Sequence, residues 1–230
     1  MDLKTAENLL KKVKQDYEIT AQEFSDTRAR PWEEFKIFLN YIKNEDKILD
    51  LGCGNGRLYK FFENQKIDYL GADDNCQGLI NLAKKKNPQV KFVVADVLNL
   101  PFQNQEFNTI FSIAMLHQIP SDELRLKALK EMKRILKNNG ILVITSWNLW
   151  QPKLILKYKL WHLLFGFKKN NLDKGDVFIP WKLKNSPIIQ RYYHAFTLKE
   201  MSRLVKKAGF KIIKKYKNYN LAIIAKNANI

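Results

Sequence analysis

The chain has 230 residues, 46% of them hydrophobic, so it is long enough for one domain with a substantial core and too apolar for a disordered protein. Its formal net charge of +17 is unevenly spread, because residues 151–230 hold 18 Lys and Arg against 3 Asp and Glu. A one-sided basic surface points to a polyanionic partner, either a nucleic acid or an anionic membrane.

The same composition disfavours several protein classes. Cys53 and Cys76 have neither a CxxC partner nor a metal-type spacing, so the sequence indicates no disulfide framework and no metal site. No segment reaches the roughly 18 apolar residues of a membrane span, and residues 1–14 are charged and helical without the apolar stretch of a secretory signal. We therefore expect a cytoplasmic protein without stable membrane insertion.

Short apolar segments alternate with helical patterns along the chain. The predicted buried strands are residues 47–52, 68–73, 90–96, 107–114 and 140–147. The clearest helix covers residues 121–140, with Ser121 as its cap and Gly140 as its end. Such alternation predicts an α/β fold with a parallel sheet and helices on both faces. Residues 209–218 and 219–227 predict two further strands, which form an antiparallel hairpin at the end of the sheet.

A glycine-rich loop follows the first predicted strand in the segment LDLGCGNGRL. Its residues Gly52, Gly54 and Gly56 let the backbone turn sharply and approach a ligand closely. The spacing is GxGxG rather than the GxGxxG of dinucleotide sites, and Asp50 stands just before the loop. An acid at that place repels a pyrophosphate and suits a ligand with a cationic amino-acid part.

Two more acids follow the next strands, Asp73 at the end of the second and Asp96 after the third. The glycine loop and the three acids resemble the class I S-adenosylmethionine-dependent methyltransferases. The resemblance implies a Rossmann-like, seven-stranded sheet and S-adenosylmethionine as the cofactor. By it, Asp73 holds the ribose, Asp96 the adenine amino group and the loop the methionine part, while Tyr17 belongs to an N-terminal lid over the cofactor.

Four further segments are more specific: FSDTRARPW (24–32), SIAMLHQI (112–119), DVFIPW (176–181) and RYYHAF (191–196). Together they resemble the tRNA methyltransferases that esterify a carboxymethyl group on wobble uridine, both the stand-alone enzyme and the methyltransferase half of the AlkB-type fusion. The catalytic residues implied are His117, Arg28, Arg191 and His194. The substrate-binding residues implied are Arg30, Trp147, Asp176, Trp181 and Tyr192. One departure is Gln118, where the family usually has a second His.

The chemistry of that reaction fits these residue types. A carboxylate is already a nucleophile, so the enzyme mainly has to align it, and Arg and His can hold it while Tyr and Trp stack on an exposed anticodon base. The RYYHAF stretch precedes a helix that Thr197 can cap. We expect Arg191, Tyr192 and His194 to form a clamp for an anion and a base at this helix start, with Phe196 anchored in the core.

One domain with four parts is expected: a helical lid (1–44), a cofactor-binding core (45–147), a basic substrate-side insertion (148–196), and the last helix with its hairpin (197–230). Within the insertion, residues 153–169 leave three readings open. They form a buried helix against the sheet, a membrane-surface helix, or a lid that faces RNA or a partner.

The resemblance also implies a partner, since enzymes of that family work with a small zinc-binding activator protein. The segment VKFVVADV (90–97) is a candidate edge strand for pairing with it. Two other functions stay open on the sequence alone. They are a methyltransferase for a lipid-like or quinone-type substrate, and a non-catalytic subunit that binds RNA or the cofactor.

Overall fold

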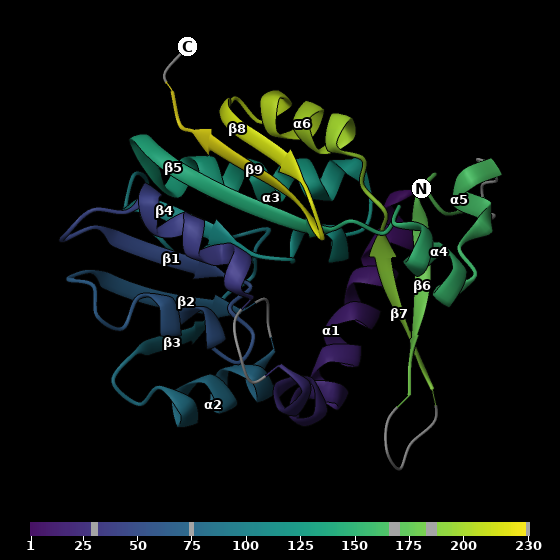
Figure 1. Cartoon of the computed structure of the whole chain (residues 1–230), viewed down its shortest axis with the longest axis horizontal. Helices are drawn as coiled ribbons and strands as arrows, with labels where there is room; N and C mark the ends of the chain where they lie inside the picture. The colour runs from purple at the N-terminus through teal and green to yellow at the C-terminus, as the bar shows by residue number, and fades with distance from the viewer. Residues whose placement is uncertain (29–31, 74–75, 166–170, 183–187, 229–230) are drawn as a thin grey trace.

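The computed structural model describes residues 1–28, 32–73, 76–165, 171–182 and 188–228. One large sheet carries helices on both faces, and a small two-stranded sheet stands beyond the carboxyl ends of its parallel strands, with α1 between the two (Figure 1). The strands of the large sheet are β1 (Lys47–Leu51), β2 (Asp68–Asp73), β3 (Lys91–Val94), β4 (Phe107–Ser112), β5 (Leu136–Trp147), β8 (Lys211–Lys217) and β9 (Asn220–Lys226).

The strand order β3-β2-β1-β4-β5-β9-β8 confirms the predicted α/β fold. Strands β1 to β5 are parallel, and the hairpin β8–β9 joins them antiparallel, with Trp147 of β5 opposite Asn220 of β9. The order reverses between β1 and β4, which opens a crevice at the carboxyl ends of these strands. The two edges of the sheet are β3 and β8.

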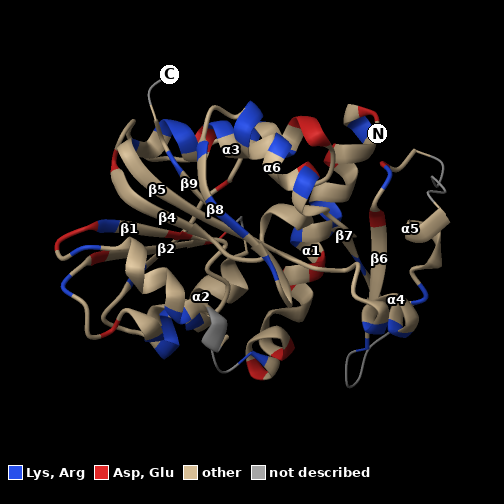
Figure 2. Ribbon diagram, turned by 45° about the horizontal axis from the view of Figure 1, so that its top comes forward, with Lys and Arg blue, Asp and Glu red and all other residues tan. Residues whose placement is uncertain are grey.

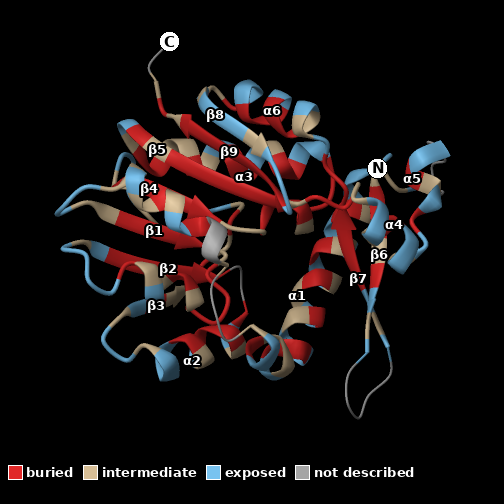
Figure 3. Ribbon diagram, in the orientation of Figure 1, coloured by how far each residue is buried: buried red, intermediate tan, exposed pale blue. Residues whose placement is uncertain are grey.

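The helices cover both faces of the large sheet, and Figure 3 colours its central strands red for buried. One face is covered by α3 (Asp122–Ile135) and α6 (Leu198–Lys207), and the amino-terminal part of α1 (Leu3–Thr27) joins their core. The other face is covered by α2 (Gln77–Lys86) and the 3-10 helices η1 (Glu33–Tyr41) and η2 (Arg57–Phe61). A third 3-10 helix, η3 (Leu116–Gln118), follows β4. The predicted two-faced arrangement is therefore confirmed.

The helix predicted for residues 121–140 is correct at its start and wrong at its end. The Ser121 side chain accepts a hydrogen bond from the Leu124 N–H and caps α3. The helix stops at Ile135, however, because Leu136 already pairs with Phe107 of β4. Gly140 lies inside β5, where a Cβ atom would stand 2.9 Å from the Asn108 carbonyl oxygen, so close backbone approach rather than helix termination explains this glycine.

The insertion folds differently from its prediction. The RYYHAF stretch is not a loop, because β6 (Asp176–Trp181) and β7 (Ile189–His194) pair antiparallel as the small sheet. The segment expected to be one helix forms two short ones, α4 (Pro152–Tyr158) and α5 (Trp161–Phe165), and residues 166–169 lie outside the described part.

Both short helices bury one side against the small sheet rather than the large one. Ile155 of α4 and Leu163 of α5 pack in one cluster with Val177 of β6 and Tyr193 of β7. Within the described ranges, no helix is long and apolar enough to cross a membrane.

Candidate cofactor and substrate site

The glycine loop after β1 takes the backbone shape that its sequence predicts. Gly52, Gly54 and Gly56 all have positive φ angles, of 79°, 56° and 72°. A Cβ atom on Gly52 would lie 2.8 Å from the Cβ and Cγ atoms of Met115, so this position tolerates only glycine. The Gly54 N–H donates to Asp73 Oδ2 at 2.8 Å, which fastens the loop to the end of β2.

A cavity of about 1020 Å³, including the solvent at its mouth, opens at the carboxyl ends of β1, β2, β4 and β5. It brings together seven residues that the sequence predicts for the site: Tyr17, Arg28, Asp50, Gly52, Gly54, Asp73 and Trp147. The other predicted site residues that the structure describes are outside its lining: Gly56, Asp96, His117, Asp176, Trp181, Arg191, Tyr192 and His194. The Asp96 carboxylate accepts a hydrogen bond from the Leu98 N–H in the turn after β3, so its contact with adenine stays a prediction.

The acid before the loop is buried and has one strong hydrogen bond. Burial raises the pKa of Asp50 to about 7, although a hydrogen bond from the Tyr69 hydroxyl at 2.6 Å and the nearby Arg57 charge act in the opposite direction. A ligand with an ammonium group would restore the full charge of this carboxylate. The glycine cradle and this acid therefore fit the amino-acid end of S-adenosylmethionine.

The lining also holds residues that sequence reasoning missed. Asn55, inside the loop, donates through Nδ2 to the Ser25 side chain and to the Arg28 carbonyl oxygen, which ties the loop to the end of α1. Arg57 lies over the Trp32 ring, 4.6 Å from its centre. In the sequence, Asn55 directly follows Gly54 and Arg57 directly follows Gly56, and this position next to a loop glycine could have marked both as site residues.

Beyond the cofactor end, aromatic rings and guanidinium groups form a continuous ladder from α1 to the large sheet. The Arg28 guanidinium lies 4.2 Å from the Phe24 ring centre and 4.7 Å from that of Trp181. The Arg191 guanidinium lies 3.8 Å from the centre of the same Trp181 ring and 5.3 Å from the Tyr193 ring centre. Cation–π contacts of this kind favour desolvated arginines.

The ladder continues from Tyr193 into the main sheet. The Tyr193 ring stacks on Trp147 at 5.1 Å and lies 5.2 Å from the His117 ring. Its hydroxyl is 3.4 Å from that of Tyr17 on α1. Tyr193 therefore connects Tyr17 of the N-terminal lid with Trp147 at the end of β5 and His117 after β4. The sequence analysis did not assign it a role.

Arg191 and His117 of the ladder are buried, and each has nitrogen atoms with no hydrogen-bond partner among the described residues. Arg191 is 6% exposed and His117 is 1% exposed. Within the described residues, Arg191 Nε and Nη1 and both ring nitrogens of His117 lack partners. Burial, aided by the neighbouring His194 and Arg191, lowers the pKa of His117 to about 3, so its ring is neutral at pH 7.

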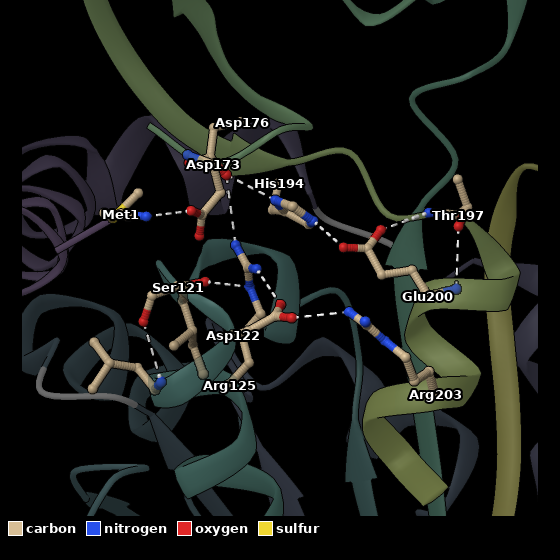
Figure 4. Close-up of polar contacts among 12 residues, drawn as sticks. Met1, Ser121, Asp122, Arg125, Asp173, Asp176, His194, Thr197, Glu200 and Arg203 are labelled. Atoms are coloured by element: carbon tan, nitrogen blue, oxygen red, sulfur yellow. Dashed lines mark hydrogen bonds and ion pairs between the residues drawn. The ribbon is translucent and has the colours of Figure 1, made fainter. Parts of the chain in front are cut away.

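The predicted clamp is divided between the two faces of β7, because side chains alternate along a strand. Tyr192 and His194 lie on the opposite face of β7 from Arg191 and Tyr193, and both bind a buried carboxylate instead. Figure 4 shows the His194 ring beside this carboxylate, which belongs to Asp176. The Tyr192 hydroxyl and His194 Nδ1 both lie 2.7 Å from Asp176 Oδ1. The geometry therefore favours anchoring of the small sheet, rather than substrate contact, for Asp176, Tyr192 and His194.

This buried group is anchored on both neighbouring helices. His194 Nε2 lies 2.9 Å from Glu200 Oε1, and Glu200 forms a capping box with Thr197, which confirms the predicted cap of α6. From α3, the fully buried Arg125 donates to the Tyr192 hydroxyl at 3.0 Å and to the Ile119 carbonyl oxygen at 2.8 Å. We refer to Arg125, Asp176, Tyr192, His194 and Glu200 as the anchor network.

The remaining predicted residues have clear positions. Trp181 stands in the ladder on β6, Phe196 is fully buried as expected, and Gln118 donates to the Ala114 carbonyl oxygen at 2.9 Å. Arg30 lies outside the described residues. The buried thiol of Cys53, whose pKa is raised by burial, packs beneath the loop.

Comparison with known proteins agrees with this geometry. Residues 49–144 match a methyltransferase domain family. The chain is 30% identical to the tRNA (carboxymethyluridine(34)-5-O)-methyltransferase of Schizosaccharomyces pombe, with 87% of this chain and 89% of the relative covered. It is 34% identical to the probable tRNA methyltransferase 9B of Bos taurus over 72% of this chain, but it spans only about a third (32%) of that relative's length.

Solved structures show the same fold. A methyltransferase of Methanosarcina mazei superimposes with a TM-score of 0.70 at 22% identity, covering 87% of this chain and all of that one. A putative methyltransferase of Haloferax volcanii, solved in complex with the activator Trm112, gives a TM-score of 0.67 at 15% identity, over 95% of this chain and 98% of the other.

The sheet order, the glycine loop and the cavity define a class I S-adenosylmethionine-dependent methyltransferase, with S-adenosylmethionine as its cofactor. Within that class, the chain belongs to the tRNA (carboxymethyluridine(34)-5-O)-methyltransferase family.

Proposed function

We propose that this protein methylates the carboxylate of 5-carboxymethyluridine at the wobble position of tRNA, with S-adenosylmethionine as the methyl donor. The observation that carries the proposal is Arg191, a buried guanidinium whose Nε and Nη1 have no hydrogen-bond partner among the described residues. A buried cation without an anion is costly, which supports a role for Arg191 in binding an anionic substrate group. A carboxylate on a flat base matches both the cation and the aromatic rings around it.

The residues divide the work between cofactor and substrate. When bound, S-adenosylmethionine supplies an electrophilic methyl group on a positively charged sulfur. Asp50 would hold its amino-acid part and Asp73 its ribose, and the loop glycines would let it lie close to the backbone. Tyr17 on α1 would close the site from above.

The substrate end needs alignment rather than a base. Arg191 would bind one carboxylate oxygen and leave the second without a neutralising partner. His117, with its pKa lowered to about 3 by burial, adds no second positive charge there and can donate one hydrogen bond. Trp147, which lines the cavity, offers a stacking surface for an extruded base.

The decisive experiment supplies labelled S-adenosylmethionine and bulk tRNA that carries carboxymethyluridine. Nucleoside analysis is expected to show label in the methyl ester of that nucleoside alone. Arg191→Gln should raise KM for the tRNA at least tenfold, whereas binding of S-adenosylhomocysteine stays as in the wild type. Label on a base nitrogen or on a lipid extract would reject the substrate assignment and leave the cofactor assignment intact.

We also propose that a small zinc-binding activator protein pairs with this chain along β3. Two observations support it: β3 is an edge strand whose Val93 and Val94 are only half-buried, and the structurally similar Haloferax volcanii protein was solved with the Trm112 activator. Hydrogen exchange of the mixed proteins should slow at residues 91–94. Unchanged exchange there, with a complex formed elsewhere, would reject this pairing.

A further inference from the structure

The basic surface of residues 151–230 is not balanced by the acids of the same segment. That segment has only Asp173, Asp176 and Glu200. Asp173 pairs with the amino group of Met1, and the other two belong to the anchor network. All three acids therefore serve contacts within the fold, and the exposed lysines keep a positive field that extends into solvent.

Several of these lysines gather beside the site although they are distant in sequence. Lys153, Lys157 and Lys159 of the α4 segment are exposed, and so is Lys217 at the end of β8. Figure 2 shows blue segments on α4 and along β8. We call these four lysines and the exposed Tyr219 the basic rim.

Hydrogen bonds fix the two parts of the basic rim to one another. Gln151 Nε2, just before α4, donates to the Tyr219 carbonyl oxygen at 3.1 Å in the turn between β8 and β9. Asn148 Nδ2 donates to the Asn218 carbonyl oxygen at 3.0 Å. The turn and the start of α4 therefore form one surface.

The same connection links the basic rim to the cavity. Trp147 lines the cavity, and the chain runs from it directly through Asn148 and Gln151 into α4. Below the rim, Ile155 packs in one cluster with Tyr193 of the aromatic ladder. A molecule bound on the rim is thus held at a fixed place relative to the substrate end of the site.

We propose that the basic rim binds the sugar-phosphate backbone of the anticodon stem-loop that presents the wobble base. This inference rests on the proposed function and adds the surface that holds the RNA. Lysines are point charges suited to successive phosphates, and such contacts fix register and orientation while the base is read elsewhere. The exposed Tyr219 ring adds a flat surface for a nucleotide next to the stem.

RNA fits this surface better than an anionic membrane does. Apart from Tyr219, the large exposed apolar side chains among the described residues after 150 lie outside the β8–β9 turn: Leu156, Trp161, Leu164 and Phe165 on α4 and α5, Ile188 before β7, and Ile213 on β8. The basic rim continues instead onto the β8–β9 turn, where the exposed residues are Lys217, Asn218 and Tyr219. Polar, basic and aromatic groups in sequence are typical of a nucleic-acid surface.

The test compares two charge reversals of equal size. The rim variant is Lys153→Glu, Lys157→Glu and Lys159→Glu in one chain. The matched control is Lys206→Glu, Lys207→Glu and Lys211→Glu, which changes exposed lysines at the end of α6 and the start of β8. Fluorescence anisotropy of a labelled, unmodified anticodon stem-loop over a series of KCl concentrations gives the Kd and its salt dependence.

The rim variant is expected to bind the stem-loop at least tenfold more weakly, and each lost phosphate contact should lower the slope of log K against log salt by about 0.7–0.9. The control should stay within about twofold of the wild type. Equal losses in both variants, or no loss in the rim variant, would overturn the proposal. The proposal would also be overturned if the rim variant kept its RNA binding but lost binding to phosphatidylglycerol vesicles, because that result assigns the surface to a membrane.

This assay is independent of the methylation reaction. The stem-loop carries no carboxymethyl group, so the binding result stands whether or not the ester forms. If the wild type fails to esterify tRNA while the rim variant loses RNA binding, the substrate assignment fails and the docking surface remains. Binding of S-adenosylhomocysteine by both variants serves as the measure of correct folding.

Discussion

Arg125 is a buried charge whose removal tests how the substrate-side sheet is held. Its side chain is 0% exposed and contacts Ile119 after η3, Asp122 on α3, and Tyr192 on β7. Arg125 Nη2 also lies 3.6 Å from Asp176 Oδ1. Arg125→Met keeps most of the volume of the side chain but removes the positive charge and every one of these hydrogen bonds.

Loss of one partner from a buried ion pair costs about 3–5 kcal/mol, because the remaining charge stays desolvated. For a chain of this size each kcal/mol corresponds to about 2–4 °C in Tm, so Arg125→Met should lower Tm by roughly 6–20 °C. Urea unfolding followed by circular dichroism measures the free energy, and differential scanning calorimetry measures Tm. Partial recovery is expected when Asp176→Asn is added, since the uncompensated acid is then removed.

Arg203 provides the control, because it pairs with Asp122, which Arg125 also contacts. Arg203 Nη2 lies 3.0 Å from Asp122 Oδ2, but its side chain is 66% exposed. Solvent screens this pair, so Arg203→Met should cost less than about 1 kcal/mol. If Arg125→Met costs no more than Arg203→Met, the reasoning about burial is refuted.

Three further outcomes follow from the site. Because burial raises the pKa of Asp50 to about 7, the affinity for S-adenosylhomocysteine measured by calorimetry should fall by about tenfold per pH unit below pH 7. Tyr69→Phe removes a hydrogen bond to the carboxylate and should shift this loss of affinity to higher pH. An affinity that does not change with pH would contradict this reasoning. Gly52→Ala should abolish that binding, because the new Cβ meets Met115 and φ is +79°; a folded variant with wild-type affinity would show that the loop tolerates a side chain. Burial acts to raise the pKa of Asp176 and Glu200, but hydrogen bonds from His194 lower it below the ordinary value. Their contribution to stability is present above about pH 4 and is lost as pH falls through the folded pKa; in urea unfolding, His194→Gln should weaken this acid dependence, and an unchanged dependence would exclude His194 as its source.

The sequence was sufficient for the cofactor side of the molecule because its signals are local. Apolar runs bounded by glycine and aspartate give the strands, and strand ends in a parallel sheet share one edge, so Asp50, Asp73 and the glycine loop come together at one place. The true end of α3, at Ile135 rather than at Gly140, was not predictable in this way. There, pairing of Leu136 with Phe107 on a distant strand takes precedence over the local glycine signal.

The substrate side was predicted as a set of residues but not as an arrangement. The pairing of β6 with β7 puts alternate residues of one motif on opposite faces, so Arg191 joins the ladder while His194 joins the anchor network. Arg125 lies in no motif that the sequence analysis marked, and Tyr193, although inside RYYHAF, received no role there. Their roles arise from contacts between residues far apart in the chain, such as Arg125 with Tyr192, 67 positions away.

The two edges of the large sheet differ in chemistry. Along β8 the exposed residues include Lys211, Lys214 and Lys215, whereas β3 presents the half-buried Val93 and Val94. Lysines along an open edge disfavour pairing with a further strand, so β3, with one exposed lysine at its start, is the edge that favours extension of the sheet. Association through strand pairing at β3 would therefore stop after one partner and would not extend into a polymer.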